Sequence, residues 1–431
     1  MTIVGKFHKI CVREHLILQE KKEIKPELVC PAGDWSGMVT AVNSGADSVY
    51  FGVKGLNMRA NASNFDVLEI KKIMNFLHGK GKKGYLTLNV IVMDSELPKM
   101  KSVLKQASEA NVDSVILWDM AVFSSAKDLG LNIHMSTQAS ISNQESLKFY
   151  SELGVKRAVL ARELSLMEIE SIVKSSNNFR SSVEIETFIH GAMCVSISGR
   201  CFLSSYSWGK SANRGECRQS CRREFEIKDS SGEAEYIVGK DYLLSPKDLN
   251  SIMFIDKLIE AGIHSFKIEG RMRSLEYINV VVSSYRKAID LYFEGGLSEK
   301  KKEELYSDLL KVYNRGFSDG FYFGKPDNRI SRKLDHKNEK LYLGEITKFY
   351  KKISVAEIII RSNSVKKGDR LFITGKKTPA QFLSVEELQQ EHKFVESALK
   401  GEMVGLKLPF IARRGDQVYI WQEKSFVKMN K

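Results

Sequence analysis

The sequence predicts an α/β fold in which a closed (β/α)8 barrel of the TIM type precedes a small β-barrel domain. Short β-rich segments alternate with helix-like segments over most of the chain, and this alternation is typical of parallel strands joined by crossover helices. There are eight such segments, which favours a closed barrel over an open sheet. After about Asp335 the pattern changes to short strands separated by turns.

The predicted barrel strands each end at a polar residue or a glycine. They are Leu28–Pro31, Ser48–Phe51, Gly84–Val90, Val115–Trp118, Asn132–Met135, Arg157–Ala161, Val183–Ile189 and Ile263–Ile268. Apolar residues spaced three and four apart predict helices between most of them, for example in Val67–Leu77 and Ile252–Ile259. We therefore divide the chain into an N-terminal arm (1–25), the barrel (26–334) and the small β-barrel domain (335–431).

The last predicted elements complete this division. Ser298–Tyr313 is expected to be a helix with Ser298 as its N-cap. The strands expected after it are Ile353–Ile360, Asp369–Thr374, Met403–Lys407 and Gln417–Trp421. Residues 337–431 hold 19 Lys/Arg and 11 Asp/Glu, so this domain carries much of the net charge of +13. A basic surface favours a polyanionic partner, with nucleic acid as the first candidate, although the domain would also serve as a stabilising lid.

One connection interrupts the alternation, namely residues 191–245 before the last barrel strand. A loop of this length in a compact barrel is usually functional, and barrel active sites lie at the C-terminal ends of the strands. We therefore expect this loop to lie over the barrel mouth. Polar residues at the strand ends are expected to surround the same mouth; among them are Gln138, Arg162, Glu163, His190, Glu269 and Arg271.

The loop carries four of the six cysteines, in the pattern Cys194-x6-Cys201-x15-Cys217-x3-Cys221. Inert buried cysteines would be out of place in a polar loop. Four thiolates suit structural zinc, whose sites usually have a short spacer in both pairs, and they also suit a four-iron cluster, which tolerates varied spacing. The spacing predicts a metal site and leaves both metals open, with iron–sulfur slightly favoured.

Other features of composition restrict the class of protein. No apolar run reaches the roughly 20 residues that a membrane-spanning helix needs, and the N-terminal sequence does not resemble a signal peptide. We therefore expect a cytoplasmic protein with reduced thiols and no membrane partner. Neither His-Glu-x-x-His nor Gly-x-Ser-x-Gly occurs, so the sequence offers no zinc-peptidase or serine-hydrolase motif.

The cysteine loop is also basic and aromatic. Residues 194–223 hold six Lys/Arg against the single acid Glu216, and Phe202, Tyr206 and Trp208 lie among them. Cations interleaved with aromatic rings suit an unpaired nucleotide and its phosphates. The same cations would also offset the charge of thiolates and a cluster, and both interpretations remain open.

Residues 186–204 (ETFIHGAMCVSISGRCFLS) resemble the signature of the U32 peptidase-like, or collagenase-like, family. Further stretches that look like landmarks of this family are Glu27–Gly33, Gly45–Tyr50, Ser136–Gln138, Leu160–Glu163, Ser245–Asp248 and Lys267–Arg273. The resemblance spans about residues 26–431 and leaves the N-terminal arm outside it.

The resemblance implies a function that the family name does not state. Members similar to this chain are implicated in oxygen-independent hydroxylation of tRNA wobble uridine, of ribosomal RNA or of ubiquinone precursors, and they carry a [4Fe–4S] cluster on cysteines placed like those here. The RNA branches are linked to prephenate. Chain length and the basic tail favour the tRNA branch, which forms 5-hydroxyuridine. The alternatives are a U32-type peptidase acting on collagen-like substrates and an RNA-binding module with a structural metal.

The resemblance and the strand ends together assign roles to the candidates. Cys194, Cys201, Cys217 and Cys221 would hold the cluster. A dicarboxylate such as prephenate would bind Arg162, Arg271 and Arg273, since guanidinium groups form paired, charge-assisted bonds with carboxylates. His190 is expected to transfer protons, and Glu163 or Glu269 to orient an arginine or act as a base. Gln138, Glu163 and Lys267 complete the expected substrate-binding set.

Overall fold

The computed structural model describes residues 24–197, 200–223, 225–228, 235–238, 246–324 and 337–424. Nearly all of the predicted N-terminal arm, with Cys11, therefore lies outside the described residues. No helix in the described part of the chain is long and apolar enough to cross a membrane.

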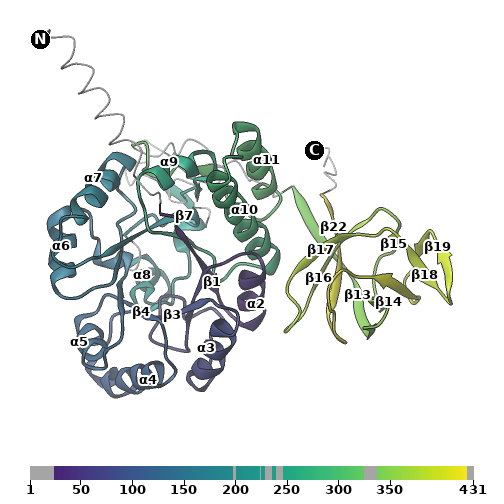
Figure 1. The fold of residues 1–431 in the computed structure, drawn as a ribbon, viewed down its shortest axis with the longest axis horizontal. Helices are drawn as coiled ribbons and strands as arrows, with labels where there is room; N and C mark the ends of the chain where they lie inside the picture. The colour runs from purple at the N-terminus through teal and green to yellow at the C-terminus, as the bar shows by residue number, and fades with distance from the viewer. Residues whose placement is uncertain are drawn as a thin grey trace, which may run out of the picture.

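A closed barrel of eight parallel strands forms the larger part of the molecule (Figure 1). The strands are β1 (Glu27–Ala32), β2 (Ser48–Gly52), β3 (Lys83–Leu88), β4 (Ser114–Leu117), β5 (Ile133–Met135), β6 (Arg157–Val159), β7 (Glu184–Gly191) and β11 (Ser265–Ile268). The barrel closes because β11 pairs in parallel with both β1 and β7. The predicted fold class is confirmed, and each of the eight predicted strands overlaps one of these.

Helices surround the barrel (Figure 1). They are α2 (Trp35–Asn43), α3 (Ile70–His78), α4 (Leu97–Glu109), α5 (Met120–Asp128), α6 (Gln144–Glu152), α7 (Leu166–Ser176), α9 (Ile255–Glu260), α10 (Leu275–Phe293) and α11 (Glu299–Leu309). Side-chain caps start several of them: the side chain of Asp34 accepts from the N–H of Gly37, and the hydroxyl of Ser298, as predicted, accepts from that of Lys301. Apolar residues three and four apart bury one face of each helix against the strands.

The long connection between β7 and β11 contains short elements of its own. They are α8 (Leu203–Trp208), β8 (Phe225–Lys228), β9 (Glu235–Val238) and β10 (Asp248–Asn250). Strand β10 pairs antiparallel with β7, and β12 (Phe317–Ser318) pairs with β10. Within residues 191–245, the connection that was expected to interrupt the alternation, α8 is only six residues long.

The C-terminal domain is one antiparallel sheet of eight strands in the order β17-β16-β22-β13-β14-β21-β18-β19. Its strands are β13 (Asn338–Tyr350), β14 (Val355–Ile360), β16 (Arg370–Thr374), β17 (Gln381–Ser384), β18 (Leu388–Gln390), β19 (Lys393–Val395), β21 (Met403–Lys407) and β22 (Gln417–Glu423), with β15 (Val365–Lys366) and β20 (Ser397–Ala398) paired separately. The outer strands β17 and β19 do not pair with each other, so the sheet is a half barrel. All four predicted strands are present, whereas β13, the longest, was not predicted.

This domain lies against α2 and α10 of the barrel (Figure 1). The side-chain amide of Asn279 donates to the carbonyl of Ala380 at 2.9 Å, and the N–H of Ala380 donates to Thr40 Oγ1 at 3.2 Å. Buried Phe372 and Trp421 belong to the same apolar cluster as the barrel core. The two domains therefore share a packed, hydrogen-bonded junction.

The barrel interior contains a buried ionic network near the N-terminal ends of the strands. Arg157 is 2 % exposed and pairs with Glu27 at 3.0 Å, Glu184 at 2.5 Å and Glu186 at 3.2 Å. Glu186 also accepts from Lys267 Nζ at 2.7 Å. These contacts join β1, β6, β7 and β11 across the barrel, which means that their register depends on charge as well as on apolar packing.

Replacing Arg157 by methionine should therefore destabilise the protein by about 3–5 kcal/mol, because it leaves buried carboxylates without their counter-charge. Urea unfolding at neutral pH would measure this loss. The matched control is Lys105→Met, which removes an exposed ion pair to Glu109 on α4 and should change stability by less than about 1 kcal/mol. Equal stability of the two variants would contradict the importance of the network.

Candidate active site

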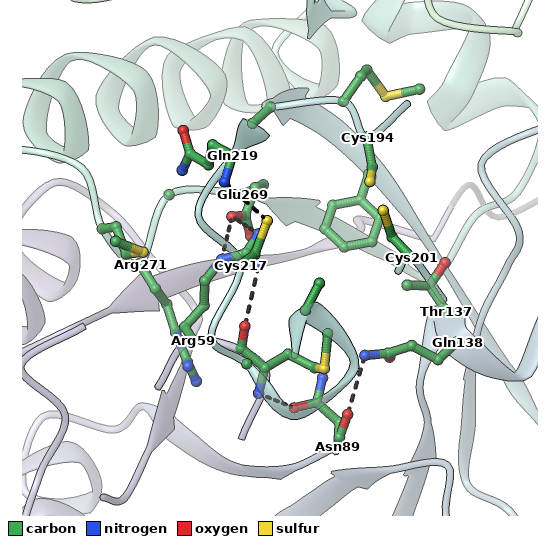
Figure 2. A pocket seen from close by; sticks show the side chains of 18 of the residues that line it. Arg59, Asn89, Thr137, Gln138, Cys194, Cys201, Cys217, Gln219, Glu269 and Arg271 are labelled. Atoms are coloured by element: carbon green, nitrogen blue, oxygen red, sulfur yellow. Dashed lines mark hydrogen bonds and ion pairs between the residues drawn. The ribbon is translucent and has the colours of Figure 1, made fainter. Parts of the chain in front are cut away.

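A cavity of about 380 Å³ opens at the C-terminal ends of the barrel strands (Figure 2). Its walls come from the ends of several strands and from the loop that follows β7. Tyr50 is contributed by β2, Thr87 by β3, Gln138 by the turn after β5 and Glu269 by the turn after β11. The cavity thus lies where the barrel fold places its active sites.

All four thiols of the loop line this cavity: Cys194, Cys201, Cys217 and Cys221. Figure 2 shows Cys194 and Cys201 at one side of the view and Cys217 nearer Arg59 and Glu269. Burial raises the pKa of Cys221, nearby Arg222 opposes the rise, and the other three thiols add to it. Each of the other three sulfur atoms therefore lies within electrostatic range of Cys221.

The thiols fit an iron–sulfur cluster in the chemistry of their donor atoms. Four cysteines from one loop face one cavity, which is the donor set that such clusters use. Within the described residues, no three His, Cys, Asp or Glu side chains lie close enough together to hold a metal ion as they stand. That finding concerns a single ion, whereas in a four-iron cluster each cysteine binds a different iron.

Backbone groups hold the thiol-bearing segments. The N–H of Leu203 donates to the sulfur of Cys201 at 3.5 Å, and the N–H of Gln219 donates to that of Cys217 at 3.4 Å. Gly215 has a φ of 85°, and a Cβ there would lie 2.2 Å from the carbonyl oxygen of Asn57. This glycine lets the loop lie directly on the connection after β2, so the loop and the barrel rim form one wall.

An ion pair that the sequence did not predict joins that connection to β11. Arg59 Nη2 lies 2.6 Å from Glu269 Oε1, and its Nε lies 3.2 Å from the same oxygen. Burial alone would raise the pKa of Glu269, but Arg59, with Arg162 and Arg271, outweighs it and lowers the pKa to about 2. Arg59 was missed because it lies in the middle of a connection; the absence of a helical pattern between Lys54 and Phe65 is the signal that could have revealed it.

Arg271 is buried in the cavity wall with neutral partners. Its Nη1 donates to Thr87 Oγ1 at 2.6 Å, and its Nη2 donates to Asn57 Oδ1. A Cβ on Gly52 would come within 2.6 Å of its guanidinium, so this glycine provides the space for it. Burial lowers the pKa of Arg271 to about 10, which still leaves it charged at neutral pH.

Arg162 is placed in the same way on the other side of the cavity. Its Nη1 donates to the carbonyl of Ala192 at 2.8 Å, and its guanidinium stacks 3.7 Å from the centroid of the Phe188 ring. Burial lowers its pKa. Across the described parts of the chain, neither Arg162 nor Arg271 has a carboxylate within 4 Å, and the Nε of each is buried without a hydrogen-bond partner.

The other predicted cations of the cavity are already paired. Lys267 Nζ lies 2.7 Å from Glu186, and Arg273 Nη2 lies 3.3 Å from Asp248. Gln138 also lines the cavity, and its amide donates to the carbonyl of Asn89 at 3.2 Å. The structure therefore brings together the four thiols and the predicted residues Gln138, Arg162, Lys267, Glu269, Arg271 and Arg273.

Two predicted residues do not reach the cavity. Glu163 is exposed and does not line it, and His190 packs among Tyr277, Tyr285 and Phe317. Burial lowers the pKa of His190 to about 3, so its imidazole is neutral at physiological pH.

A β-bulge explains the position of His190. Lys267 pairs with Phe188, whereas the next residue, Ile268, pairs with His190, so β7 has one extra residue there. The bulge breaks the alternation of sides, because two residues then oppose one on the partner strand. Phe188 lines the cavity, while His190 lies against α10. Simple alternation along the strand would not have predicted this.

Comparison with known proteins gives the chain a family. A family model described as "Peptidase family U32" matches residues 33–332. An uncharacterized protease of Methanocaldococcus jannaschii is 42% identical over 404 residues, which cover 92% of this chain and 98% of that protein. A collagenase of Porphyromonas gingivalis is 38% identical over 407 residues, with coverages of 92% and 98%.

A third relative has a name of a different kind. The tRNA hydroxylation protein P1 of Bacillus subtilis is 36% identical over 359 residues, which cover 81% of this chain and 84% of that protein. Some of these relatives are therefore named as peptidases and another as an RNA-modifying protein. The family model and these long matches show that the chain belongs to peptidase family U32.

Proposed function

We propose that this protein is an iron–sulfur-dependent tRNA-modifying enzyme that hydroxylates wobble uridine to 5-hydroxyuridine without molecular oxygen. One observation carries the proposal: four thiols line the same cavity as two arginines without a carboxylate at ion-pair distance in the described structure, the half-buried Arg162 and the buried Arg271. The relative named tRNA hydroxylation protein P1 supports the choice of reaction.

Cys194, Cys201, Cys217 and Cys221 would hold a [4Fe–4S] cluster. When bound by all four cysteines, such a cluster supplies electron transfer. The N–H groups that donate to the sulfurs of Cys201 and Cys217 are of the kind that tune a cluster's potential.

Arg162 and Arg271 are the proposed site for an anionic co-substrate. Burying a charge is costly unless it is paired, and these two guanidinium groups have neutral partners. A dicarboxylate such as prephenate would supply two negative charges to the cavity and would pair with forked donors. Arg273 and Lys267 already pair with Asp248 and Glu186, so their proposed role is to shape the cavity and support this ligand.

Glu269 is proposed to position Arg59 and not to take up a proton. With a pKa of about 2, its carboxylate stays ionised at neutral pH and is a weak base. The buried, neutral His190 is also away from the cavity, so proton transfer would pass through the substrate, its co-substrate or water.

The alternative is a peptidase, which the names of two relatives favour. Chain length and the basic C-terminal domain do not separate the two functions, because those relatives match 92% of this chain. The chemistry of the cavity supports the RNA-modifying function: among its described lining residues there is no histidine, and the single carboxylate, Glu269, is held by arginines. A thiol nucleophile there would lack a base to activate it.

The pH dependence of stability tests the role of Glu269. A lowered pKa adds stability above the unfolded value near 4.5, and this stability is lost as the pH falls toward 2. We expect Glu269→Gln to be less stable than wild type by up to about 3 kcal/mol at pH 7, with the gap shrinking below about pH 4.5. Urea unfolding between pH 7 and 3 measures the gap, with exposed Glu109→Gln as the control. A gap that does not change with pH would show that the arginines do not hold this carboxylate ionised.

Iron analysis of anaerobically purified protein tests the cluster. We expect a brown protein with iron and sulfide and a broad absorption band near roughly 400 nm. Alanine at any one of the four loop cysteines should lower the iron content. Cys30→Ala is the matched control, because Cys30 is buried in β1 away from the cavity, and it should keep its iron. Stoichiometric zinc without iron in the anaerobic protein would reject the cluster.

Mass spectrometry of digested tRNA tests the reaction itself. Deleting the gene should remove 5-hydroxyuridine-derived nucleosides from the wobble position, and a wild-type copy should restore them. Copies carrying Cys201→Ala or Arg271→Met should fail to do so; the arginine change should cost about 2–5 kcal/mol of interaction with the anionic co-substrate. If the deletion strain keeps these nucleosides and the purified protein cleaves gelatin in a Cys201-dependent manner, the peptidase alternative is correct.

A further inference from the structure

Two aromatic side chains next to the cavity face solvent. Tyr206 is 88 % exposed and Phe202 is 62 % exposed, and their ring centroids lie 6.2 Å apart. They are four residues apart at the start of α8, so they lie on one side of the helical turn. Leu203 and Ser204, between them in the chain, line the cavity.

The third aromatic residue of this loop is placed differently. The indole N–H of Trp208 donates to Ser220 Oγ at 3.0 Å, and the guanidinium of Arg223 lies 4.2 Å from its ring centroid. Trp208 thus contributes to the internal packing of the loop. Phe202 and Tyr206 bury little surface, so their rings add little to folding stability.

The backbone beneath the two exposed rings is fixed. Ser204 is buried, and its hydroxyl accepts from the N–H of Arg218 at 3.0 Å. The residue before Phe202 is Cys201, whose N–H donates to Asn213 Oδ1 at 2.8 Å. The backbone that carries the rings is therefore fixed before any ligand binds, which lowers the entropic cost of binding.

Uncompensated positive charge lies on the same loop. Arg218 and Arg223 are exposed, and no carboxylate lies within ion-pair distance of either in the described structure, whereas Lys210 and Arg214 pair with Glu216 and Glu96. Exposed rings and cations without carboxylate partners on one loop match a single-stranded nucleic acid, whose bases present π-faces and whose phosphates are anionic.

We infer that Phe202 and Tyr206 form a stacking platform for an unpaired base of RNA adjacent to the base that enters the cavity. This inference rests on the proposed function and names the residues that position its substrate. Stacking the neighbouring base on the platform would splay the RNA backbone at the rim, and Arg218 and Arg223 would contact the phosphates. The platform would bind an unpaired base and would accept any of the four bases, because every base has a π-face.

Fluorescence anisotropy with a labelled, unmodified anticodon stem–loop RNA carrying the wobble uridine tests the platform. Tyr206→Ala in the iron-loaded protein should raise the Kd about 5- to 150-fold, the range expected for loss of one stacked base. The dependence of log Kd on log salt should keep its slope, because the ring contacts no phosphate. Arg218→Met should instead flatten that slope by about 1.

Matched variants separate stacking from general damage. Tyr206→Phe keeps a ring and should bind like wild type, and Phe149→Ala, which removes a 58 % exposed ring from α6, should also bind like wild type. Iron content measured on each variant shows that the cluster is kept. A fully paired RNA duplex of the same length should bind weakly, and its Kd should not change in Tyr206→Ala.

The outcomes distinguish the two hypotheses. If wild type binds the stem–loop and both Tyr206→Ala and the double variant Phe202→Ala/Tyr206→Ala bind it with the same affinity, the platform is rejected. The proposed function would then still stand. No binding of the stem–loop by wild type would reject both. Loss of gelatin binding or cleavage in Tyr206→Ala, without any effect on RNA, would assign the rings to a peptide and overturn the inference.

Discussion

The barrel is built around a buried carboxylate that two cations share. Glu186, which is 1 % exposed, lies between Arg157 on the N-terminal side and Lys267 on the side of the cavity. Each group would be costly to bury alone, and Glu27 and Glu184 supply further negative charge to Arg157. The network fixes the strands that meet there, and it also determines which cations of the cavity are free to bind a ligand. Lys267 is already paired, while Arg162 and Arg271 are not.

This distribution of charge links the architecture to the chemistry of the site. A barrel mouth lined by several cations is not by itself specific, because many of them can be paired internally. Here Asp248, Glu186 and Glu269 form ion pairs with Arg273, Lys267 and Arg59. The cations that remain line the same cavity as the four thiols, and under the proposed function they would bind an anion next to a metal-binding donor set. The U32 family includes proteins named as peptidases and as RNA-modifying proteins, and the contents of this cavity favour the second.

The architecture could be predicted well because strands and helices depend on patterns among residues close together in the chain. β-rich segments, helical spacing and capping residues such as Ser298 depend on neighbours in the chain, and the eight barrel strands follow from them. Long-range effects were harder to predict. The bulge between β7 and β11 turns His190 away from the cavity, and Arg59 reaches Glu269 across 210 positions of sequence. Strand β13 was missed because its polar and apolar residues do not alternate regularly.

The junction between the domains fixes the distance between two surfaces that a large ligand would contact. Because Asn279, Thr40 and Ala380 tie the C-terminal sheet to α2 and α10, and Phe372 and Trp421 pack into the barrel core, the separation between sheet and mouth is constant. In a folded ligand that touches both surfaces, the second contact would lie at a fixed distance from the mouth of the barrel. Only a group of the ligand at the matching distance from its contact with the sheet would enter the mouth. The protein would then select that group by its distance as well as by its chemistry.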